Sequence, residues 1–147
     1  MVESGMRTIA VALLFCTACM MGGTSKTTTF RDTVHRYNDE VRWARLSRAV
    51  DFVAPDARVE FLKKHAKIGE QIRVSDVEIK ALQLDGDKED GVVMIQFRWI
   101  DENSLLERTS MIEQHWKSFG SAYLLVSESV AGGSNEIFVD EVAPNAK

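Results

Sequence analysis

The stretch that decides the fold is VVMIQFRWIDENSLLERTSMIEQHWKSFGSAYLLVSES, which runs from Val92 to Ser129. It predicts three consecutive β-strands separated by two short polar breaks, DENS and KSFGS. The strands are expected at Val92–Ile100, Leu105–Trp116 and Ala122–Glu128. Alternate residues of the first strand are apolar, and this period of two is typical of a sheet with one face against a core. The residues of that face are Val93, Ile95, Phe97 and Trp99.

A fourth strand is expected before these three, at Gln71–Asp85. Its alternation changes phase at Asp76-Val77 and again at Ala81-Leu82, which indicates bulges that bend the strand. A turn of charged residues and two glycines, Asp85 to Gly91, leads to the next strand. Since the connections are short, the four strands should form an antiparallel meander in which each neighbours the next.

Helices are expected before the strands. A first helix should begin near Phe30, capped by Thr28 or Thr29. A second is predicted from Leu46 to Val53, and a third from Pro55, whose fixed φ favours a first helical turn, to Gly69. The apolar stripe of the first helix follows steps of three and four residues. It consists of Phe30, Val34, Tyr37, Val41 and Ala44. Trp43, at the bend after this helix, is expected in the core, with the wall of a pocket as the alternative.

The totals fit one folded domain: 147 residues, of which 45% are apolar and 27% charged. The net charge of −4 and the lack of a basic run speak against a nucleic-acid partner. From Lys26 to Lys67 there are ten Lys/Arg and six Asp/Glu, whereas from Ile68 to Lys147 there are seven and fifteen. The helical half is therefore basic and the sheet half acidic. This asymmetry fits mutual attraction of the two layers, or orientation at an anionic surface.

The N-terminus has the pattern of a secretion signal. Residues 6–19, MRTIAVALLFCTAC, join a positive charge, an apolar run and small residues, and the run is too short for a stable membrane span. Residues 1–18 are therefore expected to be a signal peptide. The sequence matches the usual pattern of a signal peptide better if translation starts at Met6. The tetrad from Cys16 to Cys19 resembles a bacterial lipobox, with Cys16 where Leu is usual. The resemblance implies that Cys19 is lipidated, and Met20 in place of Asp implies the outer membrane. The alternative is ordinary cleavage after Ala18.

The order of the pieces resembles the cystatin-like α+β cone of the nuclear-transport-factor-2-like superfamily, and a group of bacterial lipoproteins with this layout. The resemblance rests on a helix with Tyr37, then Arg42-Trp43, then FVAP at 52–55, then EQHW at 113–116 with Gly120 before the last strand. It implies helices packed on a curved four-stranded antiparallel meander. The expected organisation is a lipidated Cys19 with a flexible tether at 19–28, the domain at 29–130 and a flexible tail at 131–147.

Catalytic chemistry has little support in the sequence. Enzymes of the resembled superfamily place a carboxylate inside the cone, and Tyr37 with Asp51 or Gln114 could face that space. However, the inward face of the Val92–Ile100 strand carries no acid. The histidines, at 35, 65 and 115, lack metal-binding spacing, and no glycine-rich phosphate loop appears. We therefore expect no catalytic residue, no metal and no cofactor.

Three functions stay open. The first is a binding or scaffolding module on the periplasmic side of the outer membrane, which contacts an envelope protein or a second copy of itself. The second is a carrier of a small apolar ligand, with a pocket of aromatic side chains. The pocket candidates are Tyr37, Trp43, Phe97, Trp99 and Trp116. The third, and the least favoured, is an isomerase-like or dehydratase-like enzyme.

Overall fold

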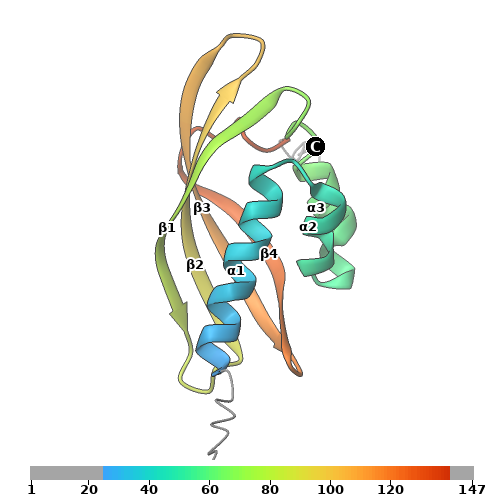
Figure 1. Ribbon diagram of the computed structural model, residues 1–147, viewed down its shortest axis with the longest axis vertical. Helices are drawn as coiled ribbons and strands as arrows, with labels where there is room; N and C mark the ends of the chain where they lie inside the picture. The colour runs from blue at the N-terminus through green and yellow to red at the C-terminus, as the bar shows by residue number, and fades with distance from the viewer. Residues whose placement is uncertain (1–24, 140–147) are drawn as a thin grey trace, which may run out of the picture.

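The computed structural model describes residues 25–139, which form helices followed by a four-stranded antiparallel sheet. The predicted α+β architecture is confirmed, and Figure 1 shows the sheet curling around α1, with α2 and α3 beside it. The strand order is β1-β2-β3-β4, which confirms the meander. The α-helices are α1 (Lys26–Arg42), α2 (Leu46–Ala49) and α3 (Arg58–Lys64), and the strands are β1 (Ile72–Leu84), β2 (Asp90–Asp101), β3 (Leu106–Phe119) and β4 (Ala122–Gly133). Within residues 25–139 no helix has the length and apolar character needed to cross a bilayer.

Helix α1 begins earlier than its apolar stripe indicates. Ser25 has an extended backbone, and its Oγ accepts a hydrogen bond from the Thr28 amide at 3.2 Å. The helix cap expected at Thr28 or Thr29 is therefore wrong. The cap is Ser25, which lies one turn earlier and accepts a hydrogen bond from the free amide of Thr28. The last residues of the expected tether, from Lys26 onward, are helical.

The second and third helices are shorter than predicted. The second is one α-turn, Leu46–Ala49, followed by the 3₁₀ turn Val50–Phe52. The chain then becomes extended: Val53 forms a parallel bridge with Leu125, and the Ala54 amide donates to the Leu125 carbonyl at 2.8 Å. Pairing with β4 thus ends the helix. Pro55 begins a 3₁₀ turn, Pro55–Ala57, that continues into α3.

Helix α1 ends in a Schellman motif that fixes Trp43 as its C-cap. The amide of Ala44 donates to the Val41 carbonyl, and the amide of Arg45 donates to the Glu40 carbonyl. Ala44 takes the left-handed conformation, with φ of 55°, which such a helix end usually gives to glycine. Trp43 is 59% exposed, so the expectation that it belongs to the core is wrong. Its position on the cap directs it away from the apolar stripe of α1.

The core lies between α1 and the inner face of the sheet. The alternation predicted for the Val92–Ile100 strand is confirmed, since Val93, Ile95, Phe97 and Trp99 are all at most 3% exposed. The predicted bends in β1 are also present, as register shifts against β2 between Val74 and Asp76 and between Ile79 and Ala81.

Two further segments pack closely against the core. At the start of β2, a side chain on Gly91 would collide with the ring of Phe30, so this position needs glycine. Beyond β4, the expected flexible tail is packed in part. Ile137 and Phe138 are buried, the Phe138 ring lies 4.8 Å from the His65 ring, and the Val139 amide donates to the Lys64 carbonyl at 2.9 Å.

Candidate functional site

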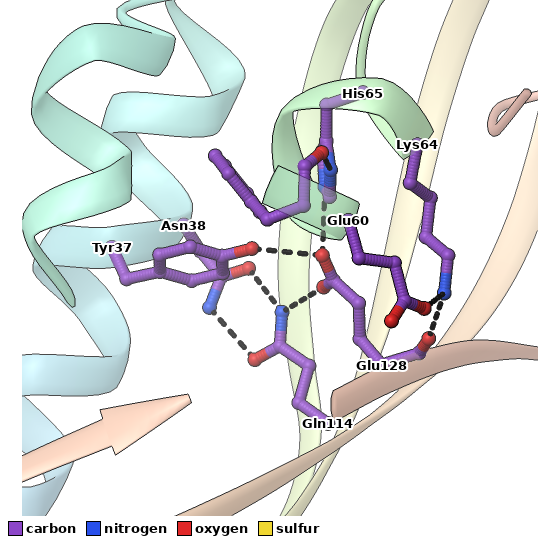
Figure 2. A network of polar contacts seen from close by, with 8 residues as sticks. Tyr37, Asn38, Glu60, Lys64, His65, Gln114 and Glu128 are labelled. Atoms are coloured by element: carbon purple, nitrogen blue, oxygen red, sulfur yellow. Dashed lines mark hydrogen bonds and ion pairs between the residues drawn. The ribbon is translucent and has the colours of Figure 1, made fainter. Parts of the chain in front are cut away.

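A cluster of polar side chains lies inside the apolar core, where α1, α3, β3 and β4 meet (Figure 2). Each member is at most 7% exposed. We call this set the buried polar cluster: Tyr37 and Asn38 from α1, His65 at the end of α3, Gln114 from β3 and Glu128 from β4.

Glu128 is the centre of the cluster. Its Oε1 accepts a hydrogen bond from the Tyr37 hydroxyl at 2.9 Å and lies 2.7 Å from Nε2 of His65. Its Oε2 accepts a hydrogen bond from the side-chain amide of Gln114 at 3.2 Å. Both carboxylate oxygens therefore have partners within the protein, which a buried carboxylate requires.

The two amides complete the cluster. Gln114 Nε2 donates to Asn38 Oδ1 at 2.9 Å, and Asn38 Nδ2 donates back to Gln114 Oε1 at 3.2 Å. Asn38 Nδ2 also donates to the Val34 carbonyl at 2.8 Å. This reciprocal pair holds α1 against β3 at a fixed position, because both amides must keep their partners once water is excluded.

Both ring nitrogens of His65 face hydrogen-bond acceptors. Its Nδ1 lies 2.8 Å from the carbonyl oxygen of Phe61, and its Nε2 faces the Glu128 carboxylate. A carbonyl and a carboxylate can only accept hydrogen bonds, so both ring nitrogens are placed to donate. His65 and Glu128 thus form a buried ion pair between α3 and β4.

The neighbours of Glu128 shift its pKa and that of Tyr37. Burial acts to raise the pKa of Glu128, but the charge of His65, together with hydrogen bonds from His65 and Tyr37, outweighs burial and leaves this pKa below its usual value. Burial, followed by the nearby Glu128 charge, raises the pKa of the Tyr37 hydroxyl well above its usual value. Glu128 is therefore ionised and Tyr37 neutral at pH 7.

A bulge in β4 turns Glu128 inward. Leu125 pairs with Trp116, and Ser127 pairs with His115, so Val126 is an extra residue in the ladder. Strict alternation from Leu125 would place Ser127 inside and Glu128 outside. The extra residue reverses the phase, so that Glu128 pairs with Gln114 on the buried face.

Sequence reasoning found only part of this cluster. It placed Tyr37 and Gln114 in the interior, which the structure confirms, whereas its alternative acid, Asp51, is exposed. It missed Glu128, because the bulge at Val126 lies in a run of apolar residues that shows no clear change of phase. The burial of Gln114 between the apolar residues Ile112 and Trp116 was the available hint, since a buried amide needs a polar partner.

Within residues 25–139 the cluster adjoins a small hollow. This hollow of about 30 Å³ lies between α3 and β4, beside Phe61, Lys64 and Glu128. This volume suits a water molecule and not an organic substrate. Lys64 crosses the hollow, and its Nζ donates to the Glu128 carbonyl at 2.8 Å.

The structure separates the predicted pocket residues into two groups. Four of them, Tyr37, Phe97, Trp99 and Trp116, are at most 3% exposed. The Tyr37 and Trp116 rings meet edge to face at 5.4 Å, and Trp99 Nε1 donates to Ser110 Oγ at 2.9 Å. Trp116 Nε1 has no acceptor among the described residues. The fifth, Trp43, is exposed and does not join the other four.

Trp43 borders an open groove of about 700 Å³ between the end of α1 and the start of β1. The Arg42 guanidinium lies 5.4 Å from the Trp43 ring centroid, and its Nη2 donates to the Ser75 carbonyl at 3.0 Å. On the other side of Arg42, a second groove of about 430 Å³ lies between α1 and the apolar residues Val77 and Ile79 of β1.

Residues 25–139 contain no group of three His, Cys, Asp or Glu side chains that could hold a metal ion. His35, His65 and His115 lie on separate elements, α1, α3 and β3. Cys19, the predicted lipidation site, lies outside the described residues.

Comparisons with known proteins identify the fold. No family model matches the chain, and no curated protein matches its sequence. A protein of unknown function with a cystatin-like fold from Nostoc punctiforme is similar in structure, with a TM-score of 0.50, 8% identity, and coverage of 71% of this chain and 88% of that one. The intermembrane space region of the chloroplast protein ARC6 aligns with a TM-score of 0.49 and 11% identity over 69% of this chain and 93% of that one.

The chain is thus an α+β protein with a cystatin-like fold. The low identities limit the likeness to the fold, which alone says little about activity.

Proposed function

We propose that this protein is a lipid-anchored component of the cell envelope that acts as a non-enzymatic binding or scaffolding module. The observation that carries the non-enzymatic part is the closed interior. The Glu128 carboxylate, the strongest candidate for a general base, is fully hydrogen-bonded to Tyr37, His65 and Gln114. A catalytic carboxylate must reach the proton that it abstracts, and the adjoining hollow of about 30 Å³ leaves no room for a substrate.

The same packing speaks against a ligand inside the cone. Four of the five predicted pocket residues are packed within the hydrophobic core and do not line a cavity. They are Tyr37, Phe97, Trp99 and Trp116. Binding is therefore expected on the outside of the domain, where Trp43 and the two grooves beside β1 are accessible.

The proposed lipid anchor rests on the sequence of residues 6–19. An anchor at Cys19 would hold the domain on the periplasmic side of the outer membrane. Replacement of Cys19 by Ser should release the protein into the soluble fraction of the envelope, because the acyl chains would be lost. Cys16→Ser is the matched control and should stay with the membrane. If Cys19→Ser partitions with the membrane as the wild type does, the anchor proposal is wrong.

Tryptophan fluorescence distinguishes the proposed binding module from a carrier that holds a small apolar ligand in its interior. We expect no spectral shift when a lipid extract of the envelope is added, because Trp99 and Trp116 are already surrounded by protein. The matched variant Trp43→Phe removes the exposed indole, so that any remaining change reports on the interior. A blue shift that persists in Trp43→Phe would support a ligand inside the cone and contradict the proposed module.

A further inference from the structure

Strand β1 is a free edge of the sheet within residues 25–139. It pairs with β2 on one side. On the other side, among the described residues, backbone covers only its first residue: Ile72 forms a bridge with Ile68, and its carbonyl accepts a hydrogen bond from the Gly69 amide at 2.8 Å. The opposite edge, β4, is partly covered by Val53 and Ala54. An uncovered edge presents backbone N–H and C=O groups that can bind another strand.

Two contacts at the ends of the β1–β2 ladder show which residues of β1 face this edge. The Glu102 amide donates to the Gln71 carbonyl, and the Asp85 amide donates to the Asp90 carbonyl, both at 2.9 Å. Because bonded and non-bonded pairs alternate in an antiparallel ladder, the register places Leu82 opposite Val93, and Leu84 opposite Gly91, in non-bonded pairs. The backbone groups of Leu82 and Leu84 therefore point to the free edge, whereas those of Gln83 point to β2.

The side chains along this edge leave an apolar strip only partly covered by α1. Val77, Ile79, Leu82 and Leu84 are all half-buried and face the core side of the sheet. The groove of about 430 Å³ separates Val77 and Ile79 from α1. A strand added to β1 would cover this strip with every second side chain.

Charges of both signs lie near the start of β1, whereas those after its end are mainly negative. Near its start, Arg42 has no carboxylate partner among the described residues and binds a backbone carbonyl of β1. After its end, the β1–β2 turn carries three aspartates that form no ion pair within residues 25–139, beside Lys88 of the same turn and Lys26, which pairs with Glu89. The three aspartates are Asp85, Asp87 and Asp90. An antiparallel strand would bring its amino end to these aspartates and its carboxyl end to Arg42.

We propose that the free edge of β1 docks an extended segment of another protein, which pairs antiparallel with β1 and has a basic amino end and an acidic carboxyl end. The alternating donors and acceptors of the edge are matched by a polypeptide strand and not by a small apolar ligand. A second copy of this chain fits less well, because the bulges in β1 bend the edge away from a flat pairing with itself. The proposal rests on the binding module proposed above.

The probe is a synthetic peptide of about ten residues, with lysines at its amino end, alternating valine and threonine in the middle and glutamates at its carboxyl end. The matched control exchanges the lysines and glutamates and keeps the composition. Amide hydrogen exchange is measured by NMR on the full chain, labelled and held in detergent. The peptide should slow exchange at Leu82 and Leu84 by at least about tenfold, and leave Gln83, already bonded to β2, nearly unchanged.

The control peptide should bind at least about tenfold more weakly, and Arg42→Gln should reduce binding of the first peptide. Unchanged exchange at Leu82 and Leu84 with saturating peptide would overturn the edge proposal. Slow exchange before any peptide is added, which dilution reverses, would also overturn it, in favour of a second copy. Neither result would overturn the proposed binding module, because that proposal is tested separately by the membrane partition of Cys19→Ser and by tryptophan fluorescence.

Discussion

His65 and Glu128 form a buried ion pair in which Nε2 of the imidazole lies 2.7 Å from Oε1 of the carboxylate, with side chains 1% and 5% exposed. The pair joins the end of α3 to β4, and the Tyr37 and Gln114 side chains add hydrogen bonds from α1 and β3. One carboxylate thus links four elements. We attribute to it the fixed position of the helices on the sheet.

Loss of this carboxylate should destabilise the protein strongly. Glu128→Ala removes the acceptor shared by His65, Tyr37 and Gln114, and removal of one partner of a buried pair typically costs about 3 to 5 kcal/mol of unfolding free energy. The matched control is Glu113→Ala, which breaks the half-exposed pair of Glu113 with His115 and should change the free energy by less than about 1 kcal/mol. Urea unfolding measures both. Equal effects of the two variants would show that the buried pair does not hold the fold together.

The lowered pKa of Glu128 predicts a loss of stability in acid. A carboxyl group whose pKa is lower in the folded protein binds protons more readily when unfolded, so its contribution is present above the unfolded pKa and disappears as the pH falls through the folded one. The difference in unfolding free energy between wild type and Glu128→Gln should therefore shrink below about pH 4. Urea unfolding from pH 7 to pH 3 tests this, and a difference that stays constant would contradict the assignment.

Replacement of Ala44 by glycine should stabilise the protein. Ala44 holds φ of 55° after the end of α1, a conformation that costs a residue with a Cβ about 1 kcal/mol relative to glycine. We expect Ala44→Gly to raise the unfolding free energy by about 0.5 to 1 kcal/mol. Ala57→Gly is the matched control, because Ala57 has φ of −93° and its replacement should instead destabilise. Thermal unfolding of both variants checks the opposite signs.

Quenching of tryptophan fluorescence should separate Trp43 from the other two tryptophans. Trp43 is 59% exposed, whereas Trp99 and Trp116 are each 1% exposed. Acrylamide should therefore quench one accessible class of indole, and Trp43→Phe should remove that class. Trp116→Phe is the matched control and should leave it intact. Quenching that is unaffected in Trp43→Phe would place the accessible indole elsewhere.

Local patterns in the chain were enough to predict the architecture. The period of two in Val93, Ile95, Phe97 and Trp99, and the helical stripe from Phe30 to Val41, predicted a sheet covered by helices, because these patterns are local and each makes one apolar face. The phase changes along β1 also predicted its bulges, since alternation on a half-buried strand is visible in the chain.

The interior of the domain and the position of Trp43 depend on contacts between distant parts of the chain. Tyr37 and Glu128 lie 91 positions apart in the chain, and one extra residue at Val126 turned the acid inward. Trp43 follows an apolar stripe, yet the left-handed turn at Ala44 left it exposed. The reason is that the bulge at Val126 and the helix cap at Trp43 reverse the direction of a side chain where the local pattern shows no change. Which direction is stable there depends on partners distant in sequence.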